Sequence, residues 1–419
     1  MNVQIKKQNN STINEDELIN LSKEELVSKI KALTAHNFQL KSIIAKSEIT
    51  KAPKRNNKPF NFAKCTFRKV LLKILYLGWD YQGYVVQEDT TNTIEHHLFE
   101  ALIKTCLIKS RQESDYHRCG RTDKGVSSYG QVISINLRSK LLNNDQDNIK
   151  EELDYCTMLN RVLPCNIQCI AWSPILNEFS ARFDCKSRVY KYFFFKGELD
   201  IEKMRIGSNH LLGDHDFRNF CKMDVGNGVT QFNRNITKIN IDLFHKWGSN
   251  KEDYDSYVIT IEGQAFLWHQ IRCIMGILFL IGQNRELPEI VKELLDVDQN
   301  PRKPEYNMAS EIPLNLFECN YDDENIIWNY SEISLNMVLE NLKKKLTYSS
   351  IKTNMLMYMI NDLEQKGFGE KKKTYFSDFL LQGIKAKNYV PVMKRQKCDS
   401  LEDKIKHYTK RKRIEINNQ

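Results

Sequence analysis

Strand-like and helix-like segments follow one another irregularly between residues 65 and 330, and this order restricts the fold more than any other feature. Short runs rich in β-branched, aliphatic and aromatic residues predict strands over residues 70–77, 131–137, 169–173, 189–195, 235–244 and 257–264. Apolar residues at helical spacing predict helices over residues 92–102, 154–163, 266–282 and 287–295, with a helix or turn at 210–220. Because no strand–helix–strand unit repeats regularly, we predict an α+β fold with a central, mainly antiparallel sheet.

The length of 419 residues indicates two packed domains with tails rather than one ordinary core. The predicted parts are residues 1–64, 65–175, 176–330 and 331–419. A charged insertion at 141–152 interrupts the first globular half. The C-terminal part is a helical extension, with helices predicted at 335–346 and 352–365, and it ends in a basic tail.

The N-terminal region carries a helix signal after a polar start at residues 1–20. Ser22 and Glu25 form a capping-box pair, and a basic linker follows at 50–60. An a/d heptad seam consists of Leu26, Ile30, Leu33, Asn37, Leu40 and Ile44. Two interpretations stay open, since the helix could pair with a second copy in a coiled coil or dock on its own domain.

The net charge of +9 favours a polyanionic partner, and nucleic acid is the commonest one. The alternative is that a general excess of lysine inflates the charge. A second basic feature is the segment 393–413, which holds nine Lys and Arg residues. This segment fits phosphate contact or nuclear import, and a solvated tail fits equally well.

The eleven cysteines follow no regular framework, which indicates free thiols in a reducing compartment. Cys156, Cys165, Cys169 and Cys185 lack ligand spacing, so we interpret them as small hydrophobic residues rather than metal ligands. Residues 1–10 are polar, and the longest apolar run is too short to cross a bilayer. We therefore expect no membrane partner and a location in the cytoplasm, the nucleus or both.

The segment from Gly120 to Gly125 is the most informative hexapeptide, because two glycines bracket a polar loop that contains Asp123. The cations of Arg118, Arg121 and Lys124 are expected to hold this carboxylate ionised. An ionised carboxylate can act as a nucleophile or a base. An Asp in such a loop is also often a turn residue or a salt-bridge partner, and the spacing alone does not decide between these roles.

A second segment, residues 179–192, interleaves basic and aromatic side chains, among them Arg182, Arg188 and Tyr190. Arg side chains can bind phosphates while a Tyr ring stacks on an unstacked base. An edge strand with cationic gatekeepers would have the same composition.

A third segment, residues 263–276, places Arg272 inside an apolar helix, where a buried Arg needs a carboxylate partner. Asp123 is one candidate for this partner. His269 in the same segment is more often a hydrogen-bonded core residue than a catalytic one.

Taken together, the three segments resemble the TruA family of tRNA pseudouridine synthases over residues 65–330. The resemblance implies that Asp123 is the catalytic aspartate, Arg121 its neighbouring arginine, Tyr190 the tyrosine that stacks on the target base, and Arg272 the partner of the carboxylate. It also implies the two-subdomain pseudouridine synthase fold and a homodimer. The side chains expected to bind substrate are Arg118, Lys124, Arg182, Arg188 and His269.

Four further stretches resemble the eukaryotic branch of this family, which modifies uridines 38 and 39 in the tRNA anticodon stem-loop. They are residues 76–79, 221–225, 277–282 and 300–304. The insertion at 141–152 and the helices after residue 330 lie outside the shared core, which leaves the substrate range open.

The implied reaction breaks the N1–C1′ bond of uridine and joins C5 to C1′, so it requires no metal or redox cofactor. The carboxylate attacks either C1′ of the sugar or C6 of the base. Three rival functions stay open: a non-catalytic RNA-binding protein with this fold, a metal-dependent nuclease or phosphotransferase that uses Asp123, and a coiled-coil adaptor. The last depends on residues 22–46 alone.

Overall fold

The computed structural model describes residues 60–417 except 142–148, 224, 226–227, 248–251, 323, 325, 368–375 and 384–387, with side chains up to residue 409. The predicted N-terminal helix with its heptad seam lies outside the described residues, as does nearly all of the basic linker. Residues 61–419 form one compact unit. The domain boundaries that the sequence suggests within this unit stay predictions.

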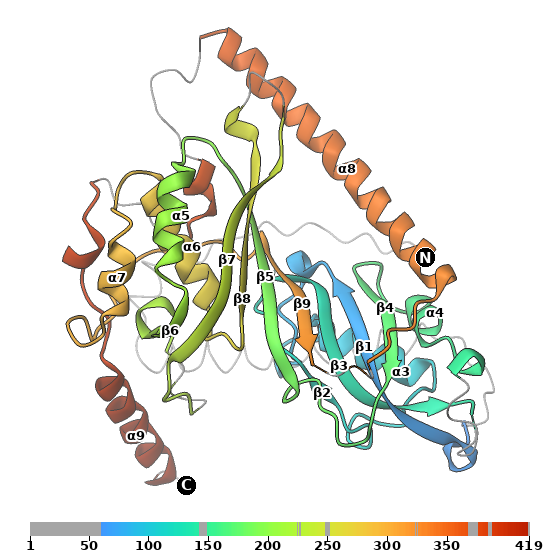
Figure 1. Cartoon of the computed structure of the whole chain (residues 1–419). Helices are drawn as coiled ribbons and strands as arrows, with labels where there is room; N and C mark the ends of the chain where they lie inside the picture. Colours follow the sequence, from blue (N-terminus) through green and yellow to red (C-terminus); the bar gives the residue numbers. More distant parts are fainter. Residues whose placement is uncertain are drawn as a thin grey trace, which may run out of the picture. The chain divides into compact units, whose positions relative to one another are not determined.

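A nine-stranded sheet runs through the described part of the chain in the order β4-β1-β3-β9-β5-β8-β7-β6, with β2 paired to β3 (Figure 1). The strands are β1 (Thr66–Tyr76), β2 (His117–Arg118), β3 (Ser127–Ser139), β4 (Ile167–Pro174), β5 (Cys185–Phe195), β6 (Gly213–Asp216), β7 (Asn233–His245), β8 (Ser256–Gly263) and β9 (Leu314–Tyr321). All strand pairs are antiparallel except β3 with β9. The predicted mainly antiparallel sheet is confirmed.

Helices lie in both halves of the molecule. They are α3 (Ile94–Lys104), α4 (Tyr155–Asn160), α5 (Ile201–Asn209), α6 (Gln270–Gly282), α7 (Ile290–Leu295), α8 (Glu332–Gln365) and α9 (Leu401–Asn417). Of these, α3, α4, α5 and α6 contribute to the hydrophobic clusters on the sheet. Short 3₁₀ turns occur at Phe62–Lys64, Gly78–Asp80, Ile149–Glu151, Arg218–Phe220, Glu252–Tyr254, Phe376–Leu380 and Val392–Lys394. Thr93, Asp154, Asp200 and Ser331 cap four of the α-helices through side-chain oxygens.

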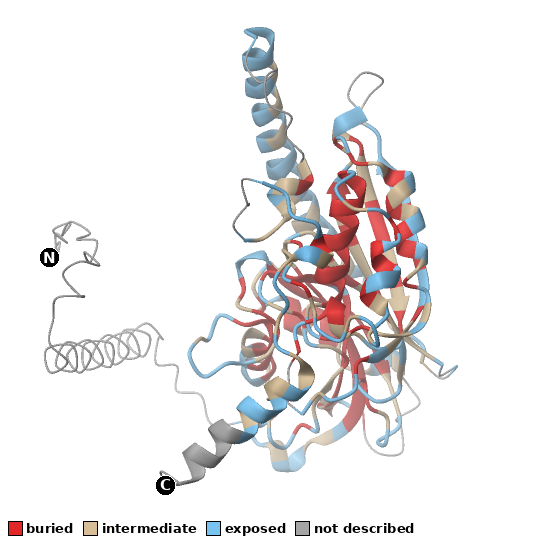
Figure 2. Ribbon diagram, turned by 90° about the vertical axis from the view of Figure 1, so that its left-hand side faces the viewer, coloured by how far each residue is buried: buried red, intermediate tan, exposed pale blue. Residues whose placement is uncertain are grey.

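Two hydrophobic clusters occupy the two halves of the sheet. One joins α3 and α4 to β1, β3 and β4, and the other surrounds α6 with β5, β7 and β8. All residues of α6 are buried, whereas α8 is mostly exposed (Figure 2). The central helix α6 is therefore a rigid support for any side chain near its first turn.

Strand β9 is the main element that the sequence analysis did not predict, and it joins the two halves of the sheet. It pairs in parallel with β3 and antiparallel with β5. Its sequence mixes polar residues such as Asn315, Glu318 and Asn320 with apolar ones, so it lacks a strong strand pattern. Its neighbours in the sheet, rather than local propensity, decide its conformation.

Other elements differ from their predicted limits. The region 210–220, predicted to be a helix or turn, forms β6 and a 3₁₀ turn, and α5, just before it, was not predicted. The two helices predicted after residue 330 are one continuous helix, α8, because the polar residues around Ser349 do not interrupt it. Part of the basic tail is helical in α9, which the sequence analysis did not predict.

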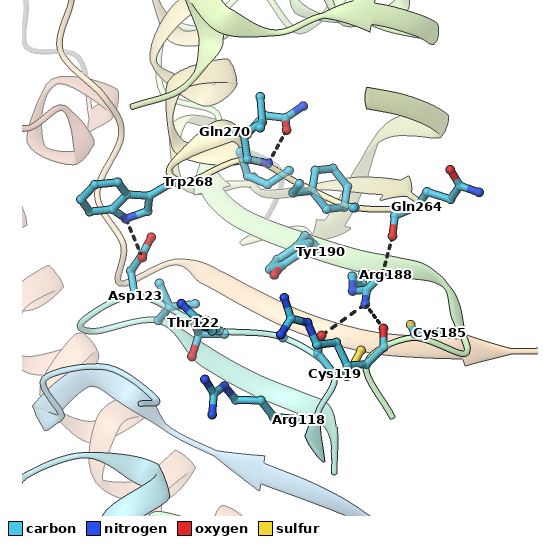
Figure 3. Close-up of a pocket in the computed structure, with 18 of the residues that line it drawn as sticks. Arg118, Cys119, Thr122, Asp123, Cys185, Arg188, Tyr190, Gln264, Trp268 and Gln270 are labelled. Atoms are coloured by element: carbon cyan, nitrogen blue, oxygen red, sulfur yellow. Dashed lines mark hydrogen bonds between the residues drawn. The ribbon is translucent and has the colours of Figure 1, made fainter. Parts of the chain in front are cut away.

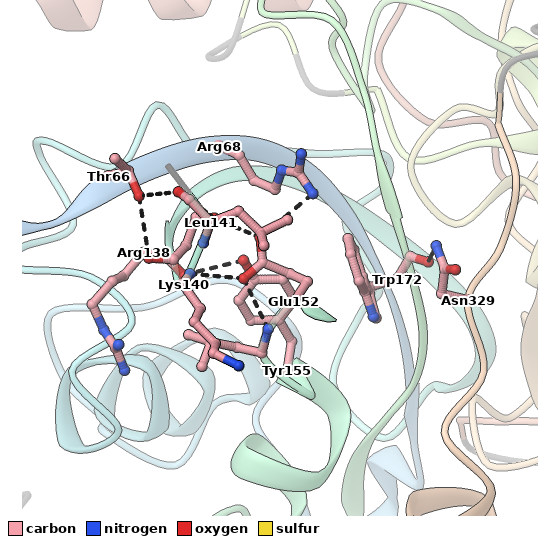
Figure 4. Close-up of polar contacts among 11 residues, drawn as sticks. Thr66, Arg68, Arg138, Lys140, Leu141, Glu152, Tyr155, Trp172 and Asn329 are labelled. Atoms are coloured by element: carbon pink, nitrogen blue, oxygen red, sulfur yellow. Dashed lines mark hydrogen bonds and ion pairs between the residues drawn. The ribbon is translucent and has the colours of Figure 1, made fainter. Parts of the chain in front are cut away.

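The end of the predicted insertion packs into the core through Glu152 (Figure 4). Its carboxylate accepts hydrogen bonds from the Ser139 hydroxyl at 2.5 Å and the Lys140 backbone N–H at 2.9 Å, and it lies 3.4 Å from Arg68 Nη1. A buried carboxylate needs such partners. They fix the chain that leaves β3 against β1.

Candidate active site

The three segments singled out in the sequence line one cavity of about 1,220 Å³ (Figure 3). The loop between β2 and β3 supplies one wall, the start of β5 a second, and the chain from β8 into α6 a third. The predicted residues on this lining are Arg118, Arg121, Asp123, Arg182, Arg188, Tyr190, His269 and Arg272. Lys124 does not line the cavity, and its side chain is exposed.

The loop that carries Asp123 is held in one conformation by contacts to the first half of the sheet. The buried Thr122 hydroxyl lies 2.7 Å from the Tyr76 hydroxyl, and the Gly125 N–H donates to the Tyr81 carbonyl. Gly125 has φ +78°, and a side chain there would meet Glu311 Cγ at 2.6 Å. This loop therefore presents the carboxylate of Asp123 from a rigid backbone.

The carboxylate of Asp123 is mostly buried beside two residues of the third segment. The Trp268 indole N–H donates to its Oδ1 at 3.1 Å, and His269 Nε2 lies 3.5 Å from its Oδ2. Burial raises the pKa of Asp123, whereas the charge of Arg272, the Trp268 hydrogen bond and the charge of Lys222 act in the opposite direction. The cations with the largest influence on the pKa of Asp123 are Arg272 and Lys222, which lie outside the loop, whereas the sequence analysis expected this role for Arg118, Arg121 and Lys124.

His269 begins α6 in an unusual backbone conformation, with φ +63°. Burial first, and then the charges of Arg272, Lys222 and Lys303, lower the pKa of His269 to about 4. The imidazole is therefore neutral at pH 7 and does not serve as a counter-ion for Asp123. Its left-handed backbone turns the chain sharply into α6 and so places Trp268 over the loop of Asp123.

The buried Arg272 has a direct carboxylate partner, and that partner is Glu311 rather than Asp123. Arg272 Nη2 lies 2.8 Å from Glu311 Oε2 and 2.6 Å from Gln382 Oε1, and its Nε donates to the Ala309 carbonyl at 2.8 Å. The predicted direct pair with Asp123 is thus corrected. The Arg272 charge still acts through space, since it is the largest of the influences that lower the pKa of Asp123.

Tyr190 on β5 lies half-buried in the cavity wall, edge-on to Phe266 at a ring separation of 5.2 Å. Burial raises the pKa of Tyr190 above its usual range, so the phenol is protonated at neutral pH. Figure 3 shows its ring between Asp123 and Arg188. The ring is therefore placed to contact a base that enters the cavity.

Two of the predicted substrate-binding arginines donate hydrogen bonds to the protein itself. Arg188 donates to the backbone carbonyls of Gln264, Cys119 and Arg182, and so ties the three cavity segments together. Arg118 donates to the buried Glu95 at 2.8 Å. Arg182 is exposed, with its guanidinium over the Phe183 ring.

The structure adds four site residues that the sequence analysis did not single out: Trp268, Lys222, Glu311 and Gln382. Trp268 lies in the third segment beside His269, which was a usable signal, and in the structure its side chain is 41% exposed. Lys222 lies in the stretch 221–225 that resembles the eukaryotic branch, whereas Glu311 and Gln382 lie in segments whose patterns carry no sign of the site.

The cysteines fit their predicted role only in part. Cys156 and Cys169 are buried with their sulfur atoms 3.4 Å apart, whereas Cys165 is exposed. Within the described ranges, no group of three or more His, Cys, Asp or Glu side chains is placed to hold a metal ion. No helix in this part of the chain is long and apolar enough to span a membrane.

Comparison with known proteins shows the family of this chain. Residues 208–322 match the tRNA pseudouridine synthase domain. The tRNA pseudouridine(38/39) synthase of Bos taurus is 41% identical over 94% of this chain and 87% of its own, and that of Saccharomyces cerevisiae is 39% identical over 77% of each. The tRNA pseudouridine synthase A of Methanosarcina acetivorans is 30% identical over 70% of this chain and 99% of its own.

These relatives are tRNA-modifying enzymes, and their similarity extends over most of this chain. The chain belongs to the TruA family of tRNA pseudouridine synthases, which isomerise uridine to pseudouridine in tRNA.

The hydrogen bond from Trp268 to Asp123 has a measurable consequence. Replacing Trp268 with Phe keeps an aromatic ring under Lys222 but removes the N–H donor to the carboxylate. We expect the single-turnover rate at neutral pH to fall about ten- to a hundred-fold, since a hydrogen bond to a charged group contributes about 1.5–3 kcal/mol. The acid limb of the pH–rate profile should also move to higher pH. An unchanged rate together with an unchanged profile would show that this bond does not matter.

Proposed function

We propose that this chain isomerises uridines 38 and 39 in the anticodon stem-loop of tRNA. Two kinds of support meet here: the relatives of Bos taurus and Saccharomyces cerevisiae carry this position in their names, and they align with most of this chain. The observation that carries the proposal is the cavity that Asp123, Tyr190 and Arg272 line together.

Asp123 is the nucleophile in this proposal, and it attacks C1′ of the sugar or C6 of the base. The target base first leaves its stack, which costs roughly a few kcal/mol. The cavity of about 1,220 Å³ is large enough for one nucleotide. Burial makes the carboxylate poorly solvated and therefore reactive, while Arg272, Trp268 and Lys222 limit the accompanying rise in its pKa.

Tyr190 contacts the base in this proposal, and a pair of variants separates its ring from its hydroxyl. Stacking contributes about 1–3 kcal/mol per base. Because the raised pKa of Tyr190 makes its phenolate scarce, we expect the ring to matter more than the hydroxyl. Tyr190→Leu should lose about ten-fold more single-turnover rate than Tyr190→Phe. Equal losses in the two variants would instead assign the effect to the hydroxyl, as a group that takes the C5 proton.

Site-mapping of pseudouridine tests the proposed positions. tRNA from cells that lack this protein should lose pseudouridine at positions 38 and 39 and keep it elsewhere. The purified enzyme should release the C5 isotope label from uridine-labelled tRNA, and substitution of cytidine at both positions should abolish the release. Release that continues at other positions would contradict the proposed site, and no release at all would favour a non-catalytic RNA-binding protein.

We also propose that the enzyme is a homodimer, in the cytoplasm, the nucleus or both. Helix α8 offers a surface for a second copy, because only its first turns pack on the sheet, through Leu335, Val338 and Leu342. Its exposed apolar side chains include Leu346, Ile351, Met355, Leu356, Met359 and Leu363. Light scattering should give twice the chain mass for the full-length protein, and Leu356→Glu with Leu363→Glu should lower it. A monomeric wild-type protein would contradict the proposal.

A further inference from the structure

A second cavity of about 1,090 Å³ adjoins the active site, and His269 lines both. Two acidic side chains, Glu305 and Asp378, lie on its lining against six cationic ones. The cationic side chains are Lys222, Arg285, Lys303, Lys394, Arg395 and Lys404. We call this second cavity the basic groove.

Two distant parts of the chain build the basic groove. Lys222 and Lys303 come from the region that matches the tRNA pseudouridine synthase domain, whereas Lys394 and Lys404 come from the C-terminal extension beyond it. Backbone hydrogen bonds join the two parts, from Glu305 N–H to the Gln396 carbonyl and from Cys398 N–H to the Lys303 carbonyl, each at 2.8 Å. The extension is thus fixed against the core as a wall of the groove.

Three lysines of the basic groove have ammonium groups that are available to bind an anionic ligand. Within the described residues, the ammonium groups of Lys222, Lys394 and Lys404 make no hydrogen bond or ion pair with the protein. Lys303, by contrast, donates to the Cys221 carbonyl at 3.1 Å. Cations that outnumber the acidic groups on one concave surface repel each other, so an anionic ligand would stabilise their arrangement.

The side chains of Lys222 and Trp268 connect the basic groove to the proposed catalytic carboxylate of Asp123. The Lys222 ammonium lies 4.4 Å from the ring centre of Trp268, and Trp268 in turn donates to Asp123. The same Lys222 lowers the pKa of both Asp123 and His269. An RNA strand whose base enters the active site would therefore have phosphates within reach of this groove.

We propose that the basic groove binds the sugar-phosphate backbone of the RNA strand that carries the target uridine. This inference rests on the proposed function and adds a binding site formed by the C-terminal extension. Phosphate contacts by Lys position a nucleic acid without reading its sequence, which suits a surface of ammonium groups beside a cavity that holds one base. Tyr306 and Tyr389 on the same lining add aromatic surface for a nucleotide.

The test compares the double variant Lys394→Ala/Lys404→Ala with the double variant Lys104→Ala/Lys140→Ala. The control removes two exposed lysines from the opposite half of the sheet, on α3 and after β3, and so changes the net charge equally. The Kd for tRNA is measured against salt concentration in an Asp123→Asn background, which prevents turnover. Thermal unfolding checks that each variant folds.

We expect the groove variant to bind tRNA at least about five-fold more weakly at physiological salt, with a log Kd–log salt slope reduced by about 1.4–1.8 for two lost phosphate contacts. Lys394→Arg/Lys404→Arg should restore the affinity, because it keeps the charges. A tRNA affinity and a salt slope of the groove variant that equal those of the control variant would overturn the proposal. Binding of an acidic protein to the groove would not rescue it. Failure of the proposed function is distinct, because it would appear as the absence of pseudouridine at positions 38 and 39 with the unmodified enzyme.

Discussion

Replacing Asp123 with Asn is expected to reduce pseudouridine formation by more than about 10⁴-fold, because the amide cannot act as a nucleophile. The loop geometry should persist, since an Asn oxygen can still accept the Trp268 N–H bond. tRNA affinity should change little. Single-turnover isotope release measures the rate, and a binding titration with tRNA serves as the control. A variant that still forms pseudouridine at a normal rate would refute the role of Asp123.

The same variant should be more stable than the wild-type enzyme at neutral pH. Folding raises the pKa of Asp123 above its ordinary value of 3.8. A raised pKa in the folded state means that the contribution to stability is full below the unfolded pKa and is lost as the pH rises through the folded pKa. The ionised carboxylate therefore destabilises the fold at pH 7, and neutral Asn removes this effect. The difference in melting temperature should close as the pH falls below 3.8, and a less stable Asp123→Asn protein at pH 7 would contradict this.

Replacing Arg272 with Ala is expected to destabilise the fold by about 3–5 kcal/mol, because it leaves Glu311 without its cationic partner. The rate at neutral pH should also fall, on the order of 10²-fold, since Arg272 is the largest of the influences that lower the pKa of Asp123. With Asp123 as the proposed nucleophile, activity requires its ionised form, so the acid limb of the pH–rate profile should move to higher pH. Chemical denaturation and the pH–rate profile measure the two effects.

Glu311→Gln is the matched control for Arg272→Ala, because it removes the negative charge of the same ion pair instead of the positive one. The charge of Glu311 raises the pKa of Asp123, so its removal should move the acid limb to lower pH. Structural damage alone would not move the two profiles in opposite directions.

Arg272→Lys, which keeps the charge but not the three donated hydrogen bonds, should retain the pH profile and lose part of the stability. Shifts in the same direction for Arg272→Ala and Glu311→Gln would argue against this electrostatic role.

Much of the fold was predictable because burial imposes local patterns. The runs that became β1, β3, β5, β7 and β8 carry alternating or continuous apolar residues, and α6 is apolar along its length. Strand β9 was not predictable in the same way, since its polar residues leave no clear period. It is a strand because β3 and β5 offer hydrogen-bonding edges on both sides of it.

The sequence by itself determined the chemical groups of the site: a carboxylate in a glycine-bracketed loop, a tyrosine among basic residues and an arginine in an apolar helix. These are local properties, so they can be recognised before the chain is folded. Only the tertiary structure decided which groups meet, because the partners are far apart in sequence. Arg272 lies 39 residues from Glu311 and 110 residues from Gln382. Trp268 lies 145 residues from Asp123. Arg118 lies close to Asp123 in sequence, yet it pairs with Glu95, and the cations with the largest influence on the pKa of the carboxylate are Arg272 and Lys222. Electrostatic interactions depend on distance and burial in space, and these follow from packing rather than from sequence order.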